Sequence, residues 1–304
     1  MDNIILLFVC LAAGAGLRQA GRVTDNAHTA LNAFIIHLSL PALILLQIHS
    51  VTLSPALFYA ALMPWLMFAA SALLFCLVGK ALQLPPGTTG ALVVVGGLGN
   101  TSFVGLPMIE AFYGPSGLPT GIVIDQLGTY LVLSTVGIML ICFYSGGVVT
   151  RGQIVMRIAK FPPLIALMIA IALMPVAYPT WLVSVLSRLG GTLAPLALVS
   201  VGLQLRLGTF RANRMPLAMG IGYKLVLGPL LMLGSYVGVM GFGGSTTEVT
   251  LFESAMGPQI GASIVAIQYG LNAELILLLV GVGTVLSFVT LPVWWQVLRT
   301  LGVG

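Results

Sequence analysis

The chain has 304 residues, of which 59% are hydrophobic and only 6% are charged, and its formal net charge is +5. A soluble domain carries roughly 25% charged residues, so this composition excludes an ordinary water-facing surface and indicates that lipid is the solvent. The basic residues are scattered without interleaved aromatic residues, which excludes a nucleic-acid-binding module. The three cysteines each lie inside an apolar run and do not form a disulfide framework.

Apolar runs bounded by Gly, Pro, Asn or charged residues predict ten membrane-spanning helices, because each span needs about 20 apolar residues. In chain order the predicted spans are 3–20, 28–48, 56–80, 87–112, 119–145, 160–177, 181–206, 215–240, 247–270 and 273–298. The first run follows Asp2 and has arginines only after it, so it is interpreted as a helix and not as a signal peptide. The expected fold class is an all-α membrane protein.

The basic residues between these spans predict the orientation of the chain, because cytoplasmic loops are enriched in Lys and Arg. Nine of them follow odd-numbered spans: Arg18, Arg22, Lys80, Arg151, Arg157, Lys160, Arg206, Arg211 and Arg214. Arg299 alone lies on the other side. We therefore expect a multi-pass protein of the cell (inner) membrane with both termini extracytoplasmic.

Weak internal echoes predict two five-helix repeats of opposite orientation. Leu-Pro-Ala-Leu at 40–43 is echoed by Ala-Pro-Leu-Ala at 194–197, and Tyr-Gly pairs near the ends of the fourth and ninth spans give a similar offset. Five spans per half is an odd number, so the second half would be inverted relative to the first. The expected organisation is one integral membrane domain with repeats at 1–150 and 151–304.

The same register aligns two segments rich in glycine or proline, GGLGNTSFVGLP at 96–107 and ESAMGPQIGAS at 253–263. Helix breaks at matching places in two halves indicate a transporter site, because the freed backbone groups must line a cavity or find partners. Asn100 and Thr101 are candidates to cap the second half of the fourth helix. The alternative is that these residues only permit close packing and a kink.

These segments also resemble the auxin efflux carrier family, which includes plant auxin exporters and bacterial carriers of malonate-like acids. Residues 100–107 followed by Glu-Ala-Phe-Tyr-Gly at 110–114 resemble the fourth-helix motif of that family. Residues 40–43 resemble its second helix and residues 194–198 its seventh. The resemblance covers essentially the whole chain.

The resemblance implies ten helices in two inverted five-helix repeats, related to the bile-acid sodium symporter-like superfamily. It also implies that the broken fourth and ninth helices cross near the membrane midplane beside the substrate. Where the family usually has Met-Pro, this chain has Met256-Gly257-Pro258, which leaves the crossing geometry of the ninth helix open. Candidate substrate-binding residues at the crossing are Asn100, Thr101, Pro107, Gly257, Pro258 and Gln259.

Ionisable residues inside the predicted spans are costly in lipid and typically functional. Glu253 lies one turn before the break in the ninth helix. Together with Met256 and Gln259 it resembles the crossing helix of bile-acid sodium symporters, where a glutamate contributes to sodium binding. The resemblance makes Glu253 and Gln259 candidate Na⁺ ligands, with Met256 beside them. The same carboxyl could instead carry a proton, or pair with Lys224.

Two further ionisable residues, Asp125 and Arg188, lie in the outer thirds of the fifth and seventh spans. A buried ion pair or a vestibule lining is favoured over a substrate site at this depth. Asp125 is also kept as a cation-coupling candidate.

The favoured function is a secondary carrier of a small organic anion, auxin-like or malonate-like, with Na⁺ or H⁺ as a coupling ion and no other cofactor. The first alternative is a sodium-coupled symporter of the bile-acid type. A membrane channel or sensor and a membrane-embedded enzyme are alternatives of another class. The sequence holds no phosphate-binding loop and no HExxH or GxSxG motif, so we expect no enzyme. The expected partners are the anion and the bilayer, and a homodimer is left open.

Overall fold

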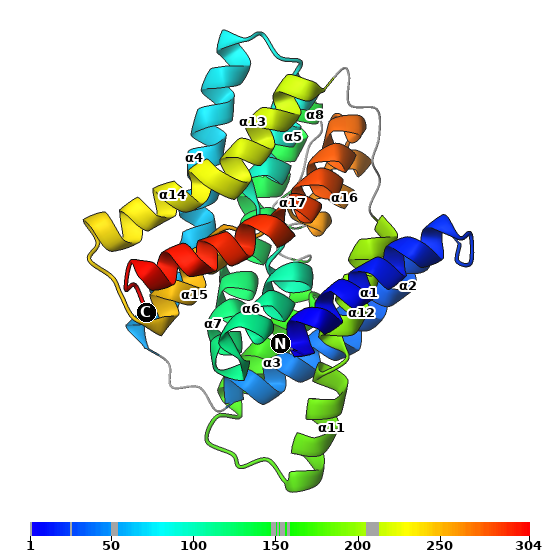
Figure 1. Ribbon diagram of the computed structural model, residues 1–304, viewed down its shortest axis with the longest axis vertical. Coiled ribbons are helices and arrows are strands. Elements are labelled where there is room, and N and C mark those ends of the chain that lie inside the picture. Colours follow the sequence, from blue (N-terminus) through cyan, green and yellow to red (C-terminus); the bar gives the residue numbers. More distant parts are fainter. Residues whose placement is uncertain are drawn as a thin grey trace. The chain divides into compact units, whose positions relative to one another are not determined.

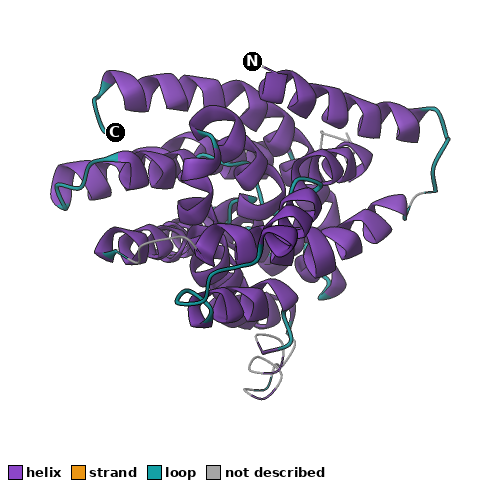
Figure 2. Cartoon of the chain, turned by 90° about the horizontal axis from the view of Figure 1, so that it is seen from below, coloured by secondary structure: helices purple, strands orange, loops and turns teal. Residues whose placement is uncertain are grey.

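The computed structural model describes residues 2–24, 26–49, 54–146, 150, 152, 156, 159–204 and 213–304. These residues form helices joined by loops, and the described part of the chain contains no strand (Figure 2). Long apolar segments fold this way because a helix satisfies its own backbone N–H and C=O groups in lipid. The predicted all-α class is confirmed.

The helices follow the predicted spans closely and are interrupted at several places. In chain order they are α1 (Asp2–Gln19), α2 (Ala27–Phe34), η1 (Ile35–Ser39), α3 (Leu40–His49), α4 (Pro55–Ala81), α5 (Pro86–Gly97), η2 (Thr101–Gly105), α6 (Leu106–Tyr113), η3 (Pro115–Gly117), α7 (Leu118–Val123), η4 (Ile124–Tyr130), η5 (Leu133–Gly137), α8 (Ile138–Ser145), α10 (Pro162–Ala172), α11 (Thr180–Gly190), α12 (Leu193–Gln204), α13 (Arg214–Gly222), η6 (Tyr223–Leu227), α14 (Gly228–Leu233), η7 (Gly234–Val239), α15 (Ser245–Ser254), α16 (Ile260–Gln268) and α17 (Ala273–Thr300). The η segments are π-helical, except η3, which is a 3₁₀ turn.

Six helical stretches in the described residues are long and apolar enough to cross a bilayer, which makes this a multi-pass membrane protein. They are Ala27–His49, Pro55–Ala81, Pro115–Ser145, Thr180–Leu203, Arg214–Val239 and Ala273–Thr300. The other predicted spans correspond to α1, to the short α10 and to two helices that are each broken in the middle. The count of ten spans and the inverted repeat therefore stay predictions.

The chain folds into two compact units. Unit 1 comprises Met1–Ser54, Ser102–Ile122 and Val155–Leu205, and unit 2 comprises Pro55–Thr101, Val123–Ile154 and Arg206–Gly304. Each unit takes segments from both halves of the chain, so the compact units differ from the predicted repeats at 1–150 and 151–304. That division into repeats stays a prediction.

Unit 1 contains a seam in which α1 packs directly on α12 (Figure 1). A Cβ atom added at Gly14 would clash with the backbone oxygen of Val199, and one added at Gly202 would clash with the backbone oxygen of Leu11. Small residues let two helices approach this closely in a membrane. In the same unit α2 packs on α12, and α3 packs on α10 and α11.

Polar contacts at the ends of the unit 1 helices join segments that are distant in the sequence. The Arg18 guanidinium donates to the backbone oxygen of Leu203 at 2.7 Å. His49 lies 2.6 Å from the backbone oxygen of Val176 and stacks on Tyr178. Each contact joins the ends of two spans to which the distribution of basic residues assigns the same side of the membrane, so the contacts agree with the predicted alternation. The side itself stays a prediction.

Unit 2 has similar contacts at the two ends of α17. At its start, Asn272 donates to the side chains of Thr88 and Asn213 at 3.0 and 3.2 Å. Beyond its end, the backbone N–H of Gly244 donates to the oxygen of Val303 at 2.6 Å. We call the Gly244 end the outer end of unit 2, because the basic residues predict that it is extracytoplasmic.

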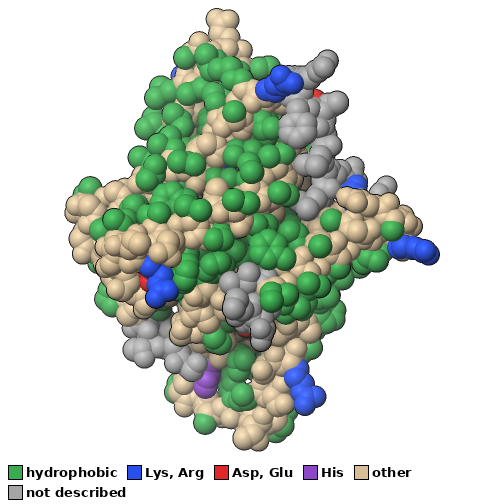
Figure 3. Space-filling view, viewed as in Figure 1, with side chains coloured by type: hydrophobic (Ala, Val, Ile, Leu, Met, Phe, Trp, Pro, Cys, Tyr) green, Lys and Arg blue, Asp and Glu red, His purple; other side chains and the backbone are tan. Residues whose placement is uncertain are grey.

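The surface carries many large hydrophobic side chains, which suits contact with lipid. Phe58, Leu73, Phe143 and Val239 are among the exposed ones. On the face seen in Figure 3, hydrophobic side chains spread over most helices and basic side chains are few. A water-facing protein seldom exposes apolar surface of this extent.

Candidate functional site

The two interrupted helices of unit 2 meet at their breaks, as their glycine and proline content predicts. Helix α5 ends at Gly97 and α15 ends at Ser254. In the breaks, the N–H of Asn100 donates to the oxygen of Gly257 at 2.8 Å, and Gly99 faces Pro258 in an antiparallel bridge. The predicted interruptions near 96–101 and 256–259 are therefore observed, and they touch.

A second backbone hydrogen bond completes this contact, which we call the crossing. The N–H of Gln259 donates to the oxygen of Leu98 at 3.1 Å. Pro258 has no N–H, so the residues on either side of the bridge supply the donors. Freed backbone groups are thus paired where lipid could not satisfy them. The position of the crossing relative to the membrane midplane stays a prediction.

The extra glycine in the ninth helix has a steric reason. A Cβ atom at Gly257 would lie 3.0 Å from the hydroxyl of Ser287 and 3.1 Å from Cα of Thr284. On the facing helix α17, a Cβ atom at Gly283 would lie 2.6 Å from Cδ of Pro258. The Gly257-Pro258 pair therefore lets the break pack against the backbone of α17. This contact explains the glycine that separates Met256 from Pro258 in the ninth helix.

Asp125 is a buried carboxylate with two hydrogen-bond donors. It lies on η4 and is 2% exposed. One carboxylate oxygen accepts from the hydroxyl of Thr101 at 2.5 Å, and the other accepts from the amide of Gln126 at 2.6 Å. Hydrogen bonds to both oxygens stabilise the ionised form of a carboxyl group. Asp125 is thus equipped to carry a negative charge.

Glu253 has no such donors. It lies in the last turn of α15 and is fully buried. Neither carboxyl oxygen has a hydrogen-bond partner within the described ranges, although the group interacts electrostatically with Asp125 and Lys224. A buried polar group without a partner costs free energy and calls for an explanation.

Lys224 on η6 is the positive charge near the crossing, and it is also fully buried. Its ammonium donates to the backbone oxygen of Ser254 at 2.8 Å and lies 3.7 Å from the sulfur of Met67. A Cβ atom at Gly99 would lie 3.3 Å from this ammonium, so the glycine makes room for it. Lys224 and Glu253 are neighbours without a direct hydrogen bond, so the simple ion pair is not observed.

A small cavity, which we call the crossing cavity, lies between these groups. Its lining residues are Met63, Pro64, Met67, Gly97, Gly99, Thr101, Thr129, Lys224 and Glu253. Its volume is about 10 Å³, which is close to the minimum that holds one water molecule. The hydroxyl oxygen of Thr129 and both oxygens of Glu253 have no hydrogen-bond partner among the described side chains and backbone. A single water molecule there would have polar partners on several sides.

Three π-helical segments position these groups. Thr101 begins η2, Asp125 lies on η4 and Lys224 lies on η6. Single π turns inside α-helices occur frequently at functional sites. Sequence reasoning did not single out Thr129 or Gly99. Thr129 lies four residues after Asp125, and this spacing places both on one helix face. The spacing therefore indicates that Thr129 lies near the same site.

The remaining predicted residues lie elsewhere. Met256 is fully buried and Gln259 is half-buried, and neither lines the crossing cavity. Pro107 is buried in the first turn of α6 and belongs to unit 1. Arg188 is exposed on α11, which does not fit a buried ion pair, and its interpretation as a vestibule-lining residue stays a prediction. Asp125 accepts hydrogen bonds from Thr101 and Gln126.

Comparison with known proteins gives one family. A family model described as a membrane transport protein matches residues 1–149 and 148–295. An uncharacterized transporter of Methanothermobacter thermautotrophicus is 28% identical over 302 residues, covering 98% of each chain. An uncharacterized transporter of Methanocaldococcus jannaschii is 25% identical over 315 residues, again covering 98% of each chain. The chain belongs to this membrane transport protein family, the auxin efflux carrier-like family that its motifs resemble.

Proposed function

We propose that the protein is a secondary transporter that carries a small organic anion, a monocarboxylate or a dicarboxylate, by alternating access. The observation that carries this proposal is the crossing itself, where two broken helices are tied by backbone hydrogen bonds next to buried polar groups. The second half of the ninth helix, α16, begins at the crossing with Ile260. Its first N–H groups and its partial positive charge favour a carboxylate ligand.

The coupling ion that fits the crossing cavity best is a proton. Two hydrogen-bond donors stabilise Asp125 as a negative carboxylate. Lys224 donates to a carbonyl oxygen as a positive ammonium. The two charges balance. Glu253 is then the third ionisable group, without donors, and its protonated form leaves the site neutral. In this proposal Glu253 takes up and releases the coupling proton.

Sodium fits less well at this place. A Na⁺ ion beside Glu253 would share a cavity of about 10 Å³ with the ammonium of Lys224, and two like charges in a buried site repel strongly. Gln259, the second candidate Na⁺ ligand, does not line that cavity. The sodium-coupled alternative is therefore an outcome that the experiment below distinguishes.

Counterflow in proteoliposomes tests the proposal. Purified protein is reconstituted, and the uptake of radiolabelled malonate and of radiolabelled indole-3-acetate is measured with and without the unlabelled acid inside. A carrier gives saturable uptake that the internal acid accelerates, and an inward proton gradient drives accumulation. A channel gives no acceleration. A response to a sodium gradient without a response to the proton gradient would contradict proton coupling.

Two variants sharpen this test. Glu253→Gln should keep exchange between internal and external acid, because the amide mimics the protonated carboxyl, but should lose accumulation against a gradient. Glu248→Gln makes the same change on the same helix α15 and outside the crossing, so it should behave as the wild type. Equal accumulation by both variants would remove Glu253 from the coupling mechanism.

A further inference from the structure

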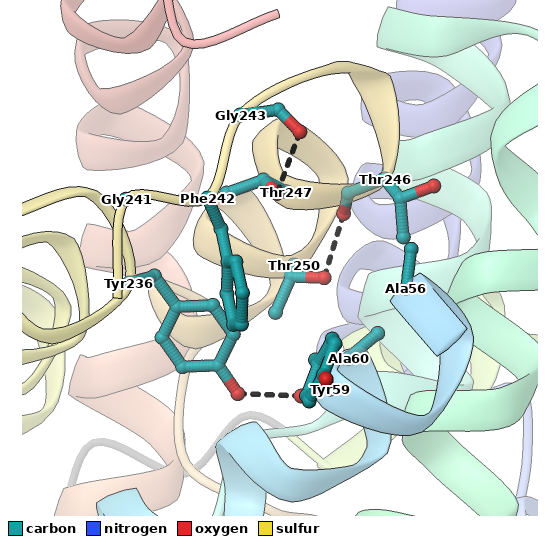
Figure 4. A pocket seen from close by; sticks show the side chains of 10 residues that line it. All are labelled: Ala56, Tyr59, Ala60, Tyr236, Gly241, Phe242, Gly243, Thr246, Thr247 and Thr250. Carbon is teal, nitrogen blue, oxygen red and sulfur yellow. Dashed lines mark hydrogen bonds between the residues drawn. The ribbon is translucent and has the colours of Figure 1, made fainter. Parts of the chain in front are cut away.

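A second cavity lies at the outer end of unit 2 (Figure 4). Its lining residues are Ala56, Tyr59, Ala60, Tyr236, Gly241, Phe242, Gly243, Thr246, Thr247 and Thr250. Its volume is about 230 Å³, enough for several water molecules. We call it the threonine cavity.

One wall of the threonine cavity is aromatic and fixed. The rings of Tyr59 and Phe242 stack with their centroids 4.5 Å apart, and Tyr236 meets Phe242 edge to face at 5.9 Å. The hydroxyl of Tyr236 donates to the backbone oxygen of Tyr59 at 2.5 Å, as the dashed line in Figure 4 shows. These contacts hold the loop at 241–243 against α4.

The other wall is the polar face of α15. Thr247 donates to the oxygen of Gly243 at 3.1 Å, and Thr250 donates to the oxygen of Thr246 at 2.6 Å (Figure 4). A hydroxyl that donates in this way keeps its lone pairs as acceptors. The threonines therefore offer hydrogen-bond acceptors to water along one side of the cavity.

The threonine cavity and the crossing cavity follow each other along the same two helices. The first reaches Ala60 on α4 and Thr250 on α15. The second begins at Met63 on α4 and Glu253 on α15, three residues farther along each helix. Three residues advance a helix by about 4.5 Å and stay on one face. Since α4 and α15 pack together, one helical turn separates the two cavities.

We propose that the groove between α4 and α15 is the path by which protons reach Glu253 from the outer end of unit 2. This inference rests on the proposed function of Glu253 as the proton acceptor. Water in the threonine cavity brings a hydronium ion to the helical turn that separates this cavity from the crossing cavity. One of its O–H bonds breaks, a new O–H bond forms on the carboxylate, and water is left. The charge on Glu253, Asp125 and Lys224 together changes from one negative to zero.

The charges that bear on this step come from few elements. The helices packed against α15 are α4, α14 and α17, and α14 has no titratable side chain. The titratable groups on α15, on the helices packed against it, and on the segments that line either cavity are Tyr59, Cys76, Lys80, Asp125, Tyr130, Tyr223, Lys224, Tyr236, Glu248, Glu253, Glu274 and Arg299. Asp125 and Lys224 are the two that interact electrostatically with Glu253. Tyr59 and Tyr236 line the threonine cavity.

Accessibility of substituted cysteines tests the outer half of the path. In a background without Cys10, Cys76 and Cys142, Thr250→Cys is compared with Val249→Cys. The two sites neighbour each other on α15 and are 1% and 2% exposed, but Val249 lines neither cavity. A membrane-impermeant thiol reagent on the outer side should label the first variant at least an order of magnitude faster. Equal rates, or faster labelling from the opposite side, would overturn the path.

Chemical labelling of Glu253 tests the inner half. Dicyclohexylcarbodiimide reacts with protonated carboxyl groups, so its adduct on the α15 peptide, measured by mass spectrometry in sealed vesicles, reports protonation of Glu253. In vesicles whose outer medium faces the outer end of unit 2, labelling should rise when that medium is acidified and not when the lumen is acidified. Ala60→Phe, which fills the floor of the threonine cavity, should slow that response, and the shape-preserving Thr250→Val should slow it less. Labelling that follows the lumenal pH would overturn the path.

The two proposals fail in different ways. If labelling follows the outer pH while Glu253→Gln keeps accumulation, the path stands and the coupling role falls. If Glu253→Gln loses accumulation while labelling follows the lumenal pH, the coupling role stands and the path falls. If outer Na⁺, and not acid, changes the labelling, the ion on this path is not a proton.

Discussion

The α1–α12 seam of unit 1 is a contact between glycines and backbone, whereas unit 2 combines such glycine contacts with buried ionisable residues. In unit 1, α1 and α12 meet through Gly14 and Gly202, each set against backbone of the other helix. In unit 2, α15 and η6 meet around Glu253 and Lys224, both fully buried. The seam of unit 1 contributes close contact, which stabilises helices in lipid. The charges of unit 2 cost free energy to bury, so they call for an explanation, which the proposed coupling role supplies.

The largest effect should come from breaking the seam. Gly14→Leu places a side chain into the backbone of Val199, and neither helix can yield without losing the interface. Overpacking typically costs about 1–3 kcal/mol and more against backbone, so the yield of monodisperse protein in detergent should collapse. Gly16→Leu is the matched control, because a Cβ atom at Gly16 meets nothing within 4 Å. Similar yields for both variants would contradict the seam.

The next effect should come from removing the positive charge of unit 2. In the charge distribution that we propose, Lys224→Met leaves an ionised Asp125 without a positive charge to balance it, and removing one partner of a buried charge pair typically costs about 3–5 kcal/mol. The thermal unfolding temperature should fall sharply. Adding Asp125→Asn should recover most of the loss, whereas adding Glu253→Gln should recover little. The reverse order would show that Glu253, and not Asp125, balances Lys224.

A smaller effect should follow from crowding the ammonium. Gly99→Ala adds a Cβ atom 3.3 Å from the nitrogen of Lys224 and should displace it by a few tenths of an ångström. We expect a loss of about 1 kcal/mol and slower counterflow. Gly96→Ala, on α5 just before the break, meets ordinary contacts of 3.6 Å or more and should be neutral or slightly stabilising. Equal unfolding temperatures and equal counterflow rates for the two variants would show that the added methyl group does not crowd the ammonium of Lys224.

The smallest effect on the fold should come from Asn100→Ala. The bond to Gly257 uses the backbone of Asn100 and survives the change. Stability should therefore stay near the wild-type value, while the apparent affinity for the transported acid falls several-fold. Counterflow kinetics at graded concentrations measure this. An unchanged KM would remove the Asn100 side chain from the substrate site.

The interruptions of the fourth and ninth helices could be predicted from sequence because glycine and proline act locally. The Gly-Leu-Gly-Asn segment ending at Asn100 and the Gly257-Pro258 pair weaken a helix wherever they occur. The relation of Glu253 to its neighbours could not be predicted in the same way. It depends on π turns in η4 and η6, and each extra residue in such a turn rotates the following side chains away from the 3.6-residue period.

The packing partners of each helix could not be predicted from the hydrophobic period either. The depth of Arg188 in its span favours a buried ion pair or a vestibule lining, yet its side chain is exposed, which does not fit the ion pair. Depth follows from position along a helix, but the direction of a side chain around the helix depends on which helices pack against it. On α11 the polar residues Thr180, Ser184, Ser187 and Arg188 lie on one helix face, and this amphipathic pattern is the signal that indicates the exposure of Arg188.

The bridge between Gly99 and Pro258 has a consequence for how such carriers change over time. The two hydrogen bonds that flank it use main-chain atoms of Leu98, Asn100, Gly257 and Gln259. Main-chain atoms are common to all amino acids, so the side chains of Asn100 and Gln259 can be exchanged without undoing the tie. A lineage can thus change these two candidate substrate-binding side chains while it inherits the crossing unchanged.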